Sequence, residues 1–84
     1  MNSKHKKTLV ALFSRQSARN IPFRDIEALL KALGCSIDEG AGSRVLFTRD
    51  NIDWPTHRPH PQKEAKPYHV REVRDFLEAL GVKP

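Results

Sequence analysis

The sequence contains one cysteine and no long apolar run, and each shortage excludes a class of protein. Cys35 is the only thiol among the 84 residues, so an internal disulfide is impossible. Structural zinc sites usually take four Cys or His ligands, so we do not expect zinc to hold the fold. No stretch of about 18 apolar residues occurs, which excludes an ordinary membrane-spanning helix. The apolar run after the basic start is too short for a secretory signal, so we expect a cytoplasmic protein with no membrane partner.

The length of the chain limits the number of domains, and its charge indicates the kind of partner. A chain of this size buries little more than roughly 60% of its unfolded surface, so we expect residues 1–84 to form one small domain. An elaborate enzyme is excluded, and no cofactor is expected. The formal net charge is +5, from 15 Lys and Arg against 10 Asp and Glu, which suits a polyanionic partner. Basic residues and two histidines gather between Gly40 and Lys66.

Hydrophobic periodicity predicts two helices in the first half of the chain. The first runs from about Ser3 to Arg15 and carries a modest apolar stripe. The second begins after Pro22 and stops at Gly34. Its apolar residues are spaced as one helical face requires: Phe23, Ile26, Leu29, Leu30 and Leu33.

A third helix is predicted near the C-terminus, after Pro67 and before Gly81. Its apolar face consists of Val70, Val73, Phe76, Leu77 and Leu80. Two pairs of opposite charge lie four residues apart on its exposed side and are expected to form weak ion pairs: Arg71 with Asp75, and Arg74 with Glu78.

Between the second and third helices the apolar period changes to two, which predicts strands. The first covers Cys35 to Glu39, the second Arg44 to Arg49 and the third Ile52 to Thr56, with a turn at residues 50–51. Pro55 lacks a backbone donor, so we expect an edge strand whose pairing fails near His57. The element order predicts an α+β fold with helices on one face of a three-stranded antiparallel sheet. We expect function on the other face, which would expose Arg44, Leu46 and Thr48 or the alternate set.

Four motifs follow one another along the chain: the helix end Leu29-Leu30-Lys31-Ala32-Leu33-Gly34, the turn Gly40-Ala41-Gly42-Ser43, the segment Arg58-Pro59-His60-Pro61 and the closing helix from Val70 to Gly81. In this order and spacing they resemble the HicA toxins of bacterial and archaeal toxin–antitoxin pairs. The resemblance implies a fold like the double-stranded-RNA-binding domain. It also implies a metal-independent endoribonuclease that cleaves mRNA and is neutralised by a HicB-like antitoxin.

The sequence departs from the family pattern at one position. A histidine, taken as the catalytic group, commonly follows the Gly-Ser pair, but here Gly42-Ser43 is followed by Arg44. A guanidinium stays protonated at neutral pH, so it can stabilise a phosphate but cannot accept a proton. Histidines exchange protons near neutrality, and we therefore predict His57 and His60 as the catalytic residues. The predicted RNA-binding residues are Ser43, Arg44, Arg58, Lys63 and Lys66.

Other interpretations of these residues stay open. His57 can be a strand terminus and His60 a loop residue bonded to a carbonyl, and a His-x-x-His metal site lacks a third ligand. Trp54 and Tyr68 can either stack on unpaired bases or anchor the loop to the core. His5 and His69 have no assigned role, and we expect Cys35 to be buried and unreactive. The chain as a whole can also be a non-catalytic RNA-binding or partner-binding module, or a basic structural or regulatory protein.

Overall fold

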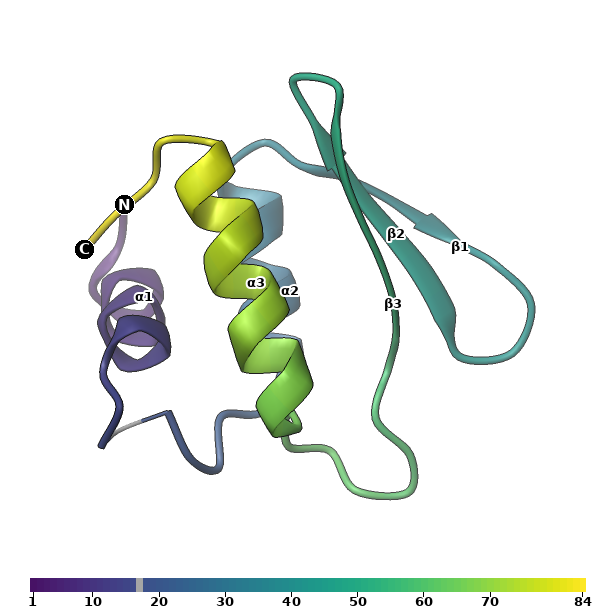
Figure 1. The fold of residues 1–84 in the computed structure, drawn as a ribbon, viewed down its shortest axis with the longest axis horizontal. Helices are drawn as coiled ribbons and strands as arrows, with labels where there is room; N and C mark the ends of the chain where they lie inside the picture. The colour runs from purple at the N-terminus through teal and green to yellow at the C-terminus, as the bar shows by residue number, and fades with distance from the viewer. Residues whose placement is uncertain (17) are drawn as a thin grey trace.

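The computed structural model describes residues 1–16 and 18–84 and has the predicted α+β fold. Its order, α-α-β-β-β-α, matches the arrangement of the double-stranded-RNA-binding domain (Figure 1). The elements are α1 (Ser3–Phe13), α2 (Phe23–Ala32), β1 (Ser36–Glu39), β2 (Arg44–Arg49), β3 (Ile52–His57) and α3 (Pro67–Ala79). Within these residues, no helix combines the length and the apolar character needed to cross a membrane.

The helices gather on one side of the sheet, as Figure 1 shows. Phe23 of α2 packs its ring 6.4 Å from that of Phe47 in β2, and Trp54 in β3 stacks on Phe47 at 5.3 Å. Phe76 of α3 lies 6.2 Å from Trp54 on the same face. The core therefore lies between the sheet and the helices, and the helices leave the opposite sheet face uncovered.

Trp54 is an anchor of this core. Its side chain is buried, and its indole N–H donates to the Glu72 carboxylate of α3 at 2.9 Å. A buried indole has its one donor satisfied and has no free face for a nucleotide base. Of the two interpretations of Trp54, the structure supports the anchor.

The strands form an antiparallel sheet in the order β1-β2-β3. The turn between β2 and β3 consists of Asp50 and Asn51, with φ angles of 53° and 65°. Positive φ at both central residues is typical of the two-residue hairpin turn that matches strand twist. This turn fixes the register, in which Val45 and Phe47 face the helices and Arg44 and Leu46 face outwards.

The prediction that pairing fails near His57 is wrong. His57 is the partner of Arg44, and the next residue, Arg58, donates its backbone N–H to the Ser43 carbonyl at 2.8 Å. The Arg58–Ser43 bond flanks Arg44 and His57, so these two residues form a non-hydrogen-bonded pair. Bonded and non-bonded pairs alternate along an antiparallel ladder, and Leu46–Pro55, two residues away, is therefore a non-bonded pair as well. The Pro55 nitrogen therefore faces the open edge of the sheet, where its missing proton removes no ladder bond.

The two ion pairs predicted on α3 are also absent. Among the described residues, the ion pairs with a nitrogen–oxygen distance within 4.0 Å are Lys4–Asp25, Arg49–Asp50, Arg58–Glu27 and Arg58–Glu39. Exposed pairs at i and i+4 gain little energy in water and lose side-chain entropy, so helical spacing alone does not hold them together. Arg71 and Arg74 are consequently free to face another surface.

Replacing Ile26 by Val tests the position of the core. The Ile26 side chain is fully buried on α2, so losing one methylene should lower the free energy of unfolding by about 0.5–1.5 kcal/mol. The control is Val10→Ala at an exposed position of α1, where we expect a change below about 0.5 kcal/mol. Urea denaturation measures both, and equal effects would contradict the assigned core.

Candidate nucleic-acid interface

The site begins with the tight turn that joins β1 to β2. Gly40 donates its backbone N–H to the Arg44 carbonyl at 2.9 Å, and the Arg44 N–H donates to the Ala41 carbonyl at 3.2 Å. A β-carbon at Gly40 would lie 3.2 Å from that of Arg44, so the turn packs closely against the start of β2. Gly42 has a φ of 63°, which favours glycine. The turn therefore fixes where Ser43 and Arg44 lie.

His57 lies beside this turn at the end of β3. It is exposed and pairs with Arg44 on the outer face of the sheet. Side chains of a non-bonded pair have β-carbons roughly 4.5–5.5 Å apart. The His57 Nδ1 also lies 3.3 Å from the Ser43 hydroxyl oxygen, within hydrogen-bonding distance. A ring whose Nδ1–H donates to Ser43 presents Nε2 as a free proton acceptor.

His60 lines a neighbouring hollow. This hollow has a volume of about 560 Å³ and is lined by Gly42, Ser43, Arg58, Pro59 and His60. A second hollow, of about 520 Å³, is lined by Arg44 and His57 together with Asp38 and Glu39 of β1. Consecutive residues of the chain, Ser43 and Arg44, line the two hollows, and the Ser43 hydroxyl links the hollow of His60 to the His57 ring. We call Ser43, Arg44, His57 and His60 the histidine cluster.

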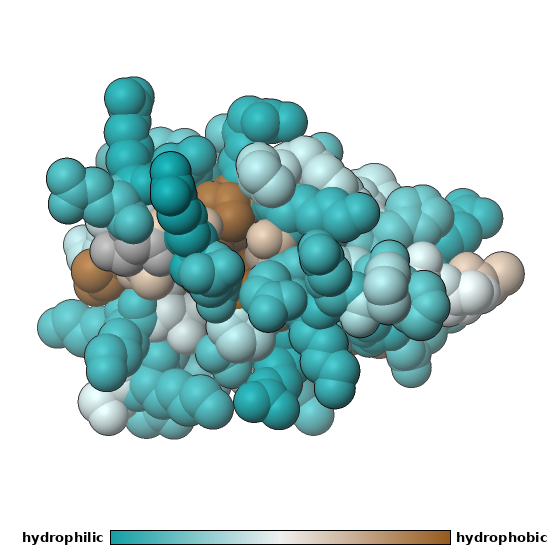
Figure 2. Space-filling view, turned by 90° about the horizontal axis from the view of Figure 1, so that it is seen from below, coloured by the Kyte–Doolittle hydropathy of each residue, from teal (hydrophilic) through white to brown (hydrophobic). Residues whose placement is uncertain are grey.

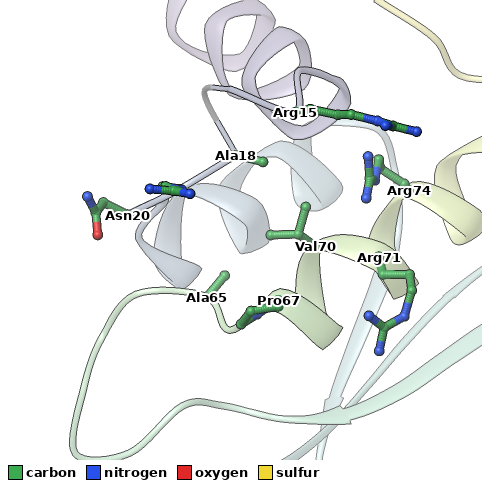
Figure 3. Close-up of a pocket in the computed structure, with 9 residues that line it drawn as sticks. Arg15, Ala18, Asn20, Ala65, Pro67, Val70, Arg71 and Arg74 are labelled. Carbon is green, nitrogen blue, oxygen red and sulfur yellow. The ribbon is translucent and has the colours of Figure 1, made fainter.

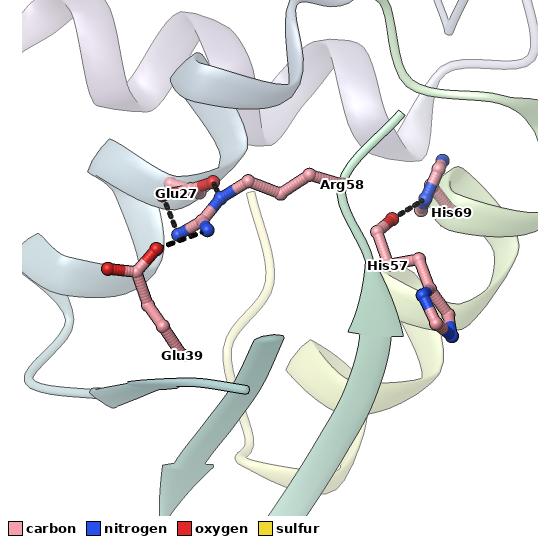
Figure 4. Close-up of polar contacts among 5 residues, drawn as sticks. All are labelled: Glu27, Glu39, His57, Arg58 and His69. Carbon is pink, nitrogen blue, oxygen red and sulfur yellow. Dashed lines mark hydrogen bonds and ion pairs between the residues drawn. The ribbon is translucent and has the colours of Figure 1, made fainter. Parts of the chain in front are cut away.

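Arg58 is engaged within the protein. Its guanidinium makes a two-pronged contact with the Glu27 carboxylate of α2 and a further hydrogen bond to Glu39 of β1 (Figure 4). The hydrogen bonds that Arg58 donates, to Glu27 above all and then to Glu39, raise its pKa above the ordinary value. Its charge is permanent and is balanced by two carboxylates. Arg58, the residue that follows β3, thus connects the end of this strand to both α2 and β1.

The two predicted lysines are exposed on the segment between β3 and α3. Lys63 lines a hollow of about 390 Å³ together with Phe23, Glu27 and Arg58. Its backbone carbonyl accepts a hydrogen bond from the Phe23 N–H at 2.9 Å, which fixes the segment to the start of α2. Lys66 precedes α3 and lines none of these hollows. The structure therefore brings Lys63, but not Lys66, to the side of Arg58.

His69 is the residue that the sequence analysis missed. It is fully buried at the start of α3, where its Nδ1 accepts the Lys66 backbone N–H at 2.9 Å. Its Nε2 lies 2.7 Å from the His57 carbonyl oxygen, so the proton of the neutral ring sits on Nε2 and is donated there (Figure 4). The carbonyl of His57 faces His69 while its ring points away. His69 therefore holds the backbone of the histidine cluster.

Burial is the main reason why the pKa of His69 is lowered, and nearby Lys66 and His57 act in the same direction. The hydrogen bond to the His57 carbonyl and the charge of Glu72 act against it. Two rings enclose it: Tyr68 at 4.0 Å and Phe23 at 5.1 Å between centroids. A second ring proton would face the Lys66 N–H, so the folded protein favours neutral His69.

Cys35 has the unreactive character expected from the sequence. It is buried, and burial raises the pKa of its thiol. Since the thiolate is the reactive form, Cys35 does not act as a nucleophile at neutral pH.

Among the described residues, no group of three His, Cys, Asp or Glu side chains is placed to hold a metal ion.

A comparison with family models adds to this geometry. The fold is that of a small α+β protein, and one end of its sheet carries basic side chains and an exposed imidazole. Residues 23–82 match the model of the HicA toxin of bacterial toxin–antitoxin systems, and the chain belongs to this family. No curated protein and no solved structure gives a significant match. The matched region contains the whole histidine cluster and leaves α1 outside.

The buried imidazole predicts a dependence of stability on pH. The pKa of His69 is lowered from its ordinary value of 6.5, so the unfolded chain binds more protons below that pH. The contribution of His69 to stability is therefore fully present above about pH 6.5 and is lost as the pH falls through the lowered pKa of the folded state. Urea denaturation between about pH 7.5 and pH 5 should show a steeper loss for the wild type than for His69→Gln. The other three histidines are present in both proteins, so equal slopes would contradict the role of His69.

The carboxylate contacts of Arg58 predict a structural role for this side chain. Arg58→Gln leaves Glu27, whose side chain is only 23% exposed, without its partner. We expect a fall of about 1.5–3 kcal/mol in the free energy of unfolding, as for hydrogen bonds to charged groups. The matched control is Arg49→Gln, whose partner Asp50 is 70% exposed and where about 0–1 kcal/mol is expected. Urea denaturation compares them, and a smaller effect at position 58 would contradict this role.

Proposed function

We propose that this chain is the toxin of a type II toxin–antitoxin pair that binds and cleaves mRNA in the cytoplasm, with residues 1–84 acting as one domain. The observation that carries the proposal is the pairing of Arg44 with His57 on the outer face of the sheet. Family resemblance puts the usual catalytic histidine where Arg44 stands. In this chain an imidazole reaches the same part of the surface from the neighbouring strand.

The chemistry requires two proton transfers and a cation. The ribose 2′-hydroxyl attacks the adjacent phosphorus, its proton passes to one imidazole, and a 2′,3′-cyclic phosphate forms. The bond to the 5′ oxygen breaks, and that oxygen takes a proton from the second imidazole. His57 and His60 supply the two imidazoles, and Arg44 stabilises the negative charge on the phosphate oxygens. No step needs a metal ion.

The remaining predicted residues bind and position the RNA. Ser43 orients the His57 ring through Nδ1, and Lys63 adds an exposed positive charge. Lys66 lies further along the same segment and contacts the RNA backbone outside the cluster. Arg58 acts at the hollow that it shares with His60, while Glu27 and Glu39 hold its guanidinium in place.

A HicB-like antitoxin would inhibit the toxin by covering the histidine cluster. Neither Arg44 nor Lys63 makes an ion pair within the described part of the chain. An acidic partner surface with an apolar rim would neutralise these charges and exclude RNA from the imidazoles. Inhibition of this kind needs no change in the shape of the toxin.

One observation favours a second candidate, a binding module without catalysis. Arg44 cannot accept a proton, and Asp38 and Glu39 line the hollow that it shares with His57. Carboxylates beside an anionic substrate weaken its binding. A chain that binds RNA or a protein partner, with no cleavage, would keep the fold and the basic segment.

Single replacements of His57 and His60 by Ala separate the two candidates. We expect each to reduce the rate of RNA cleavage by about 10²–10⁴-fold, as for loss of a general acid or base, and to relieve growth arrest. Cleavage of the wild type should persist in EDTA. Cleavage by purified protein, and mapping of message ends after expression of the chain without an antitoxin, measure these outcomes.

The control is His5→Ala on α1, which should leave cleavage unchanged. Arg44→His tests the departure from the family pattern: reduced cleavage assigns Arg44 to the phosphate, whereas a strong increase shows that the wild type is a weakened enzyme. Wild-type protein that binds RNA without cleaving it would replace the proposed function by the second candidate.

A further inference from the structure

A groove with a volume of about 660 Å³ lies between the linker from α1 to α2 and the start of α3. Four arginines line it: Arg15, Arg19, Arg71 and Arg74. Its apolar lining includes Val70 and Ala18, and Figure 3 shows Val70 turned from α3 towards the side of Ala18, while the Arg71 side chain extends in the opposite direction. We call this feature the arginine groove.

The groove carries an uncompensated positive charge. No Asp or Glu is among the described residues that line it. The four guanidiniums make no hydrogen bond or ion pair with any described residue. Like charges around one hollow repel each other, so an anion that enters relieves this repulsion. Guanidinium binds phosphate with two parallel hydrogen bonds, which makes phosphate the fitting ligand class.

The shape of the groove suits a chain of phosphates rather than an isolated one. The groove is open, and hydrophilic side chains surround a small hydrophobic spot on this end of the molecule (Figure 2). Ala65, Pro67 and Val70 offer an apolar surface for sugars or bases between the guanidiniums. Single-stranded nucleic acid is held by this combination of a cationic track and apolar contacts.

The groove is continuous with the histidine cluster through one segment of backbone. The segment that carries His60 and Lys63 continues to Ala65 and Pro67 in the groove. It is fixed to the start of α2 by a hydrogen bond from the Ala65 N–H to the Ile21 carbonyl at 2.7 Å. Figure 1 shows this segment and the α1–α2 linker at the same end of the molecule. An RNA leaving the cluster along the segment therefore reaches the groove.

We propose that the arginine groove binds backbone phosphates of the single-stranded RNA whose cleavage we assign to the histidine cluster. The inference rests on the proposed function and adds a second RNA-binding surface to it. Arg15 and Arg19 lie outside the region that matches the HicA model, so this surface combines α3, which lies within the matched region, with two residues that precede it.

The test measures binding of 2′-O-methylated RNA, which lacks the attacking hydroxyl and stays intact. Oligomers of about 4 and about 16 nucleotides span the usual site sizes of single-strand-binding domains. Arg71→Gln/Arg74→Gln should weaken binding of the longer oligomer about tenfold and lower the salt slope by about 0.7 for each phosphate that the protein no longer neutralises. The shorter oligomer, which fits within the cluster, should bind both proteins equally.

The matched control is Lys31→Gln/Lys83→Gln, which removes the same charge at exposed positions of α2 and the C-terminal tail, outside the groove. In single-turnover cleavage of unmodified RNA, the groove variant should need a higher protein concentration for half-maximal rate, with the maximal rate constant unchanged. The thermal stability of both variants checks that they fold.

If the control variant binds the longer oligomer as weakly as the groove variant does, the loss of affinity comes from net charge alone and the proposal is overturned. Unchanged binding of the longer oligomer would also overturn it, and loss of antitoxin binding alone would assign the groove to a protein partner instead. In each of these cases, RNA cleavage by the wild-type protein would still support the proposed function. Wild-type protein that neither binds nor cleaves RNA would remove the proposed function itself.

Discussion

The register between β2 and β3 is the constraint on which the site depends. With Arg44 opposite His57, both side chains emerge on the face of the sheet that the helices leave open. A slip of one residue would turn His57 towards the core and Thr56 outwards, because side chains alternate along a strand. The turn at Asp50 and Asn51 prevents this slip at one end of the hairpin, and the bond from Arg58 to Ser43 prevents it at the other.

Beyond the sheet, two polar side chains hold the backbone of the site from opposite sides. His69 donates to the carbonyl of His57 from α3, and Arg58 reaches the carboxylates of α2 and β1. Burying an imidazole is costly unless both nitrogens are bonded, and those of His69 are. The protein thus uses one histidine as a structural support and leaves a second, His57, exposed on the outer face of the sheet.

The sequence predicted the parts of the structure that depend on local periodicity. The faces of α2 and α3 and the alternation in β2 are repeated patterns, and each was confirmed. Pairing beyond Pro55 was predicted wrongly, because the direction of its nitrogen depends on which pairs of the ladder are hydrogen-bonded. The support from His69 was missed since its partners are backbone groups of Lys66 and His57, which no side-chain pattern reveals. Only the place of His69 in the first turn of α3, directly before the apolar face, hinted at burial.

Carboxylates lie beside the positive charges near the histidine cluster but not beside those of the arginine groove, among the described residues. Beside the histidine cluster, Glu27 and Glu39 balance the charge of Arg58, and Asp38 and Glu39 line the hollow that Arg44 shares with His57, so the net positive charge there is limited. In the arginine groove no carboxylate is among the described lining residues, so none opposes the attraction of an anion. Phosphate contacts distant from the reacting bond add affinity without requiring strict placement, whereas proton transfer requires imidazoles held to within hydrogen-bonding distance. Strong, tolerant binding in the groove would therefore compensate for a cluster whose own attraction for RNA its neighbouring carboxylates reduce.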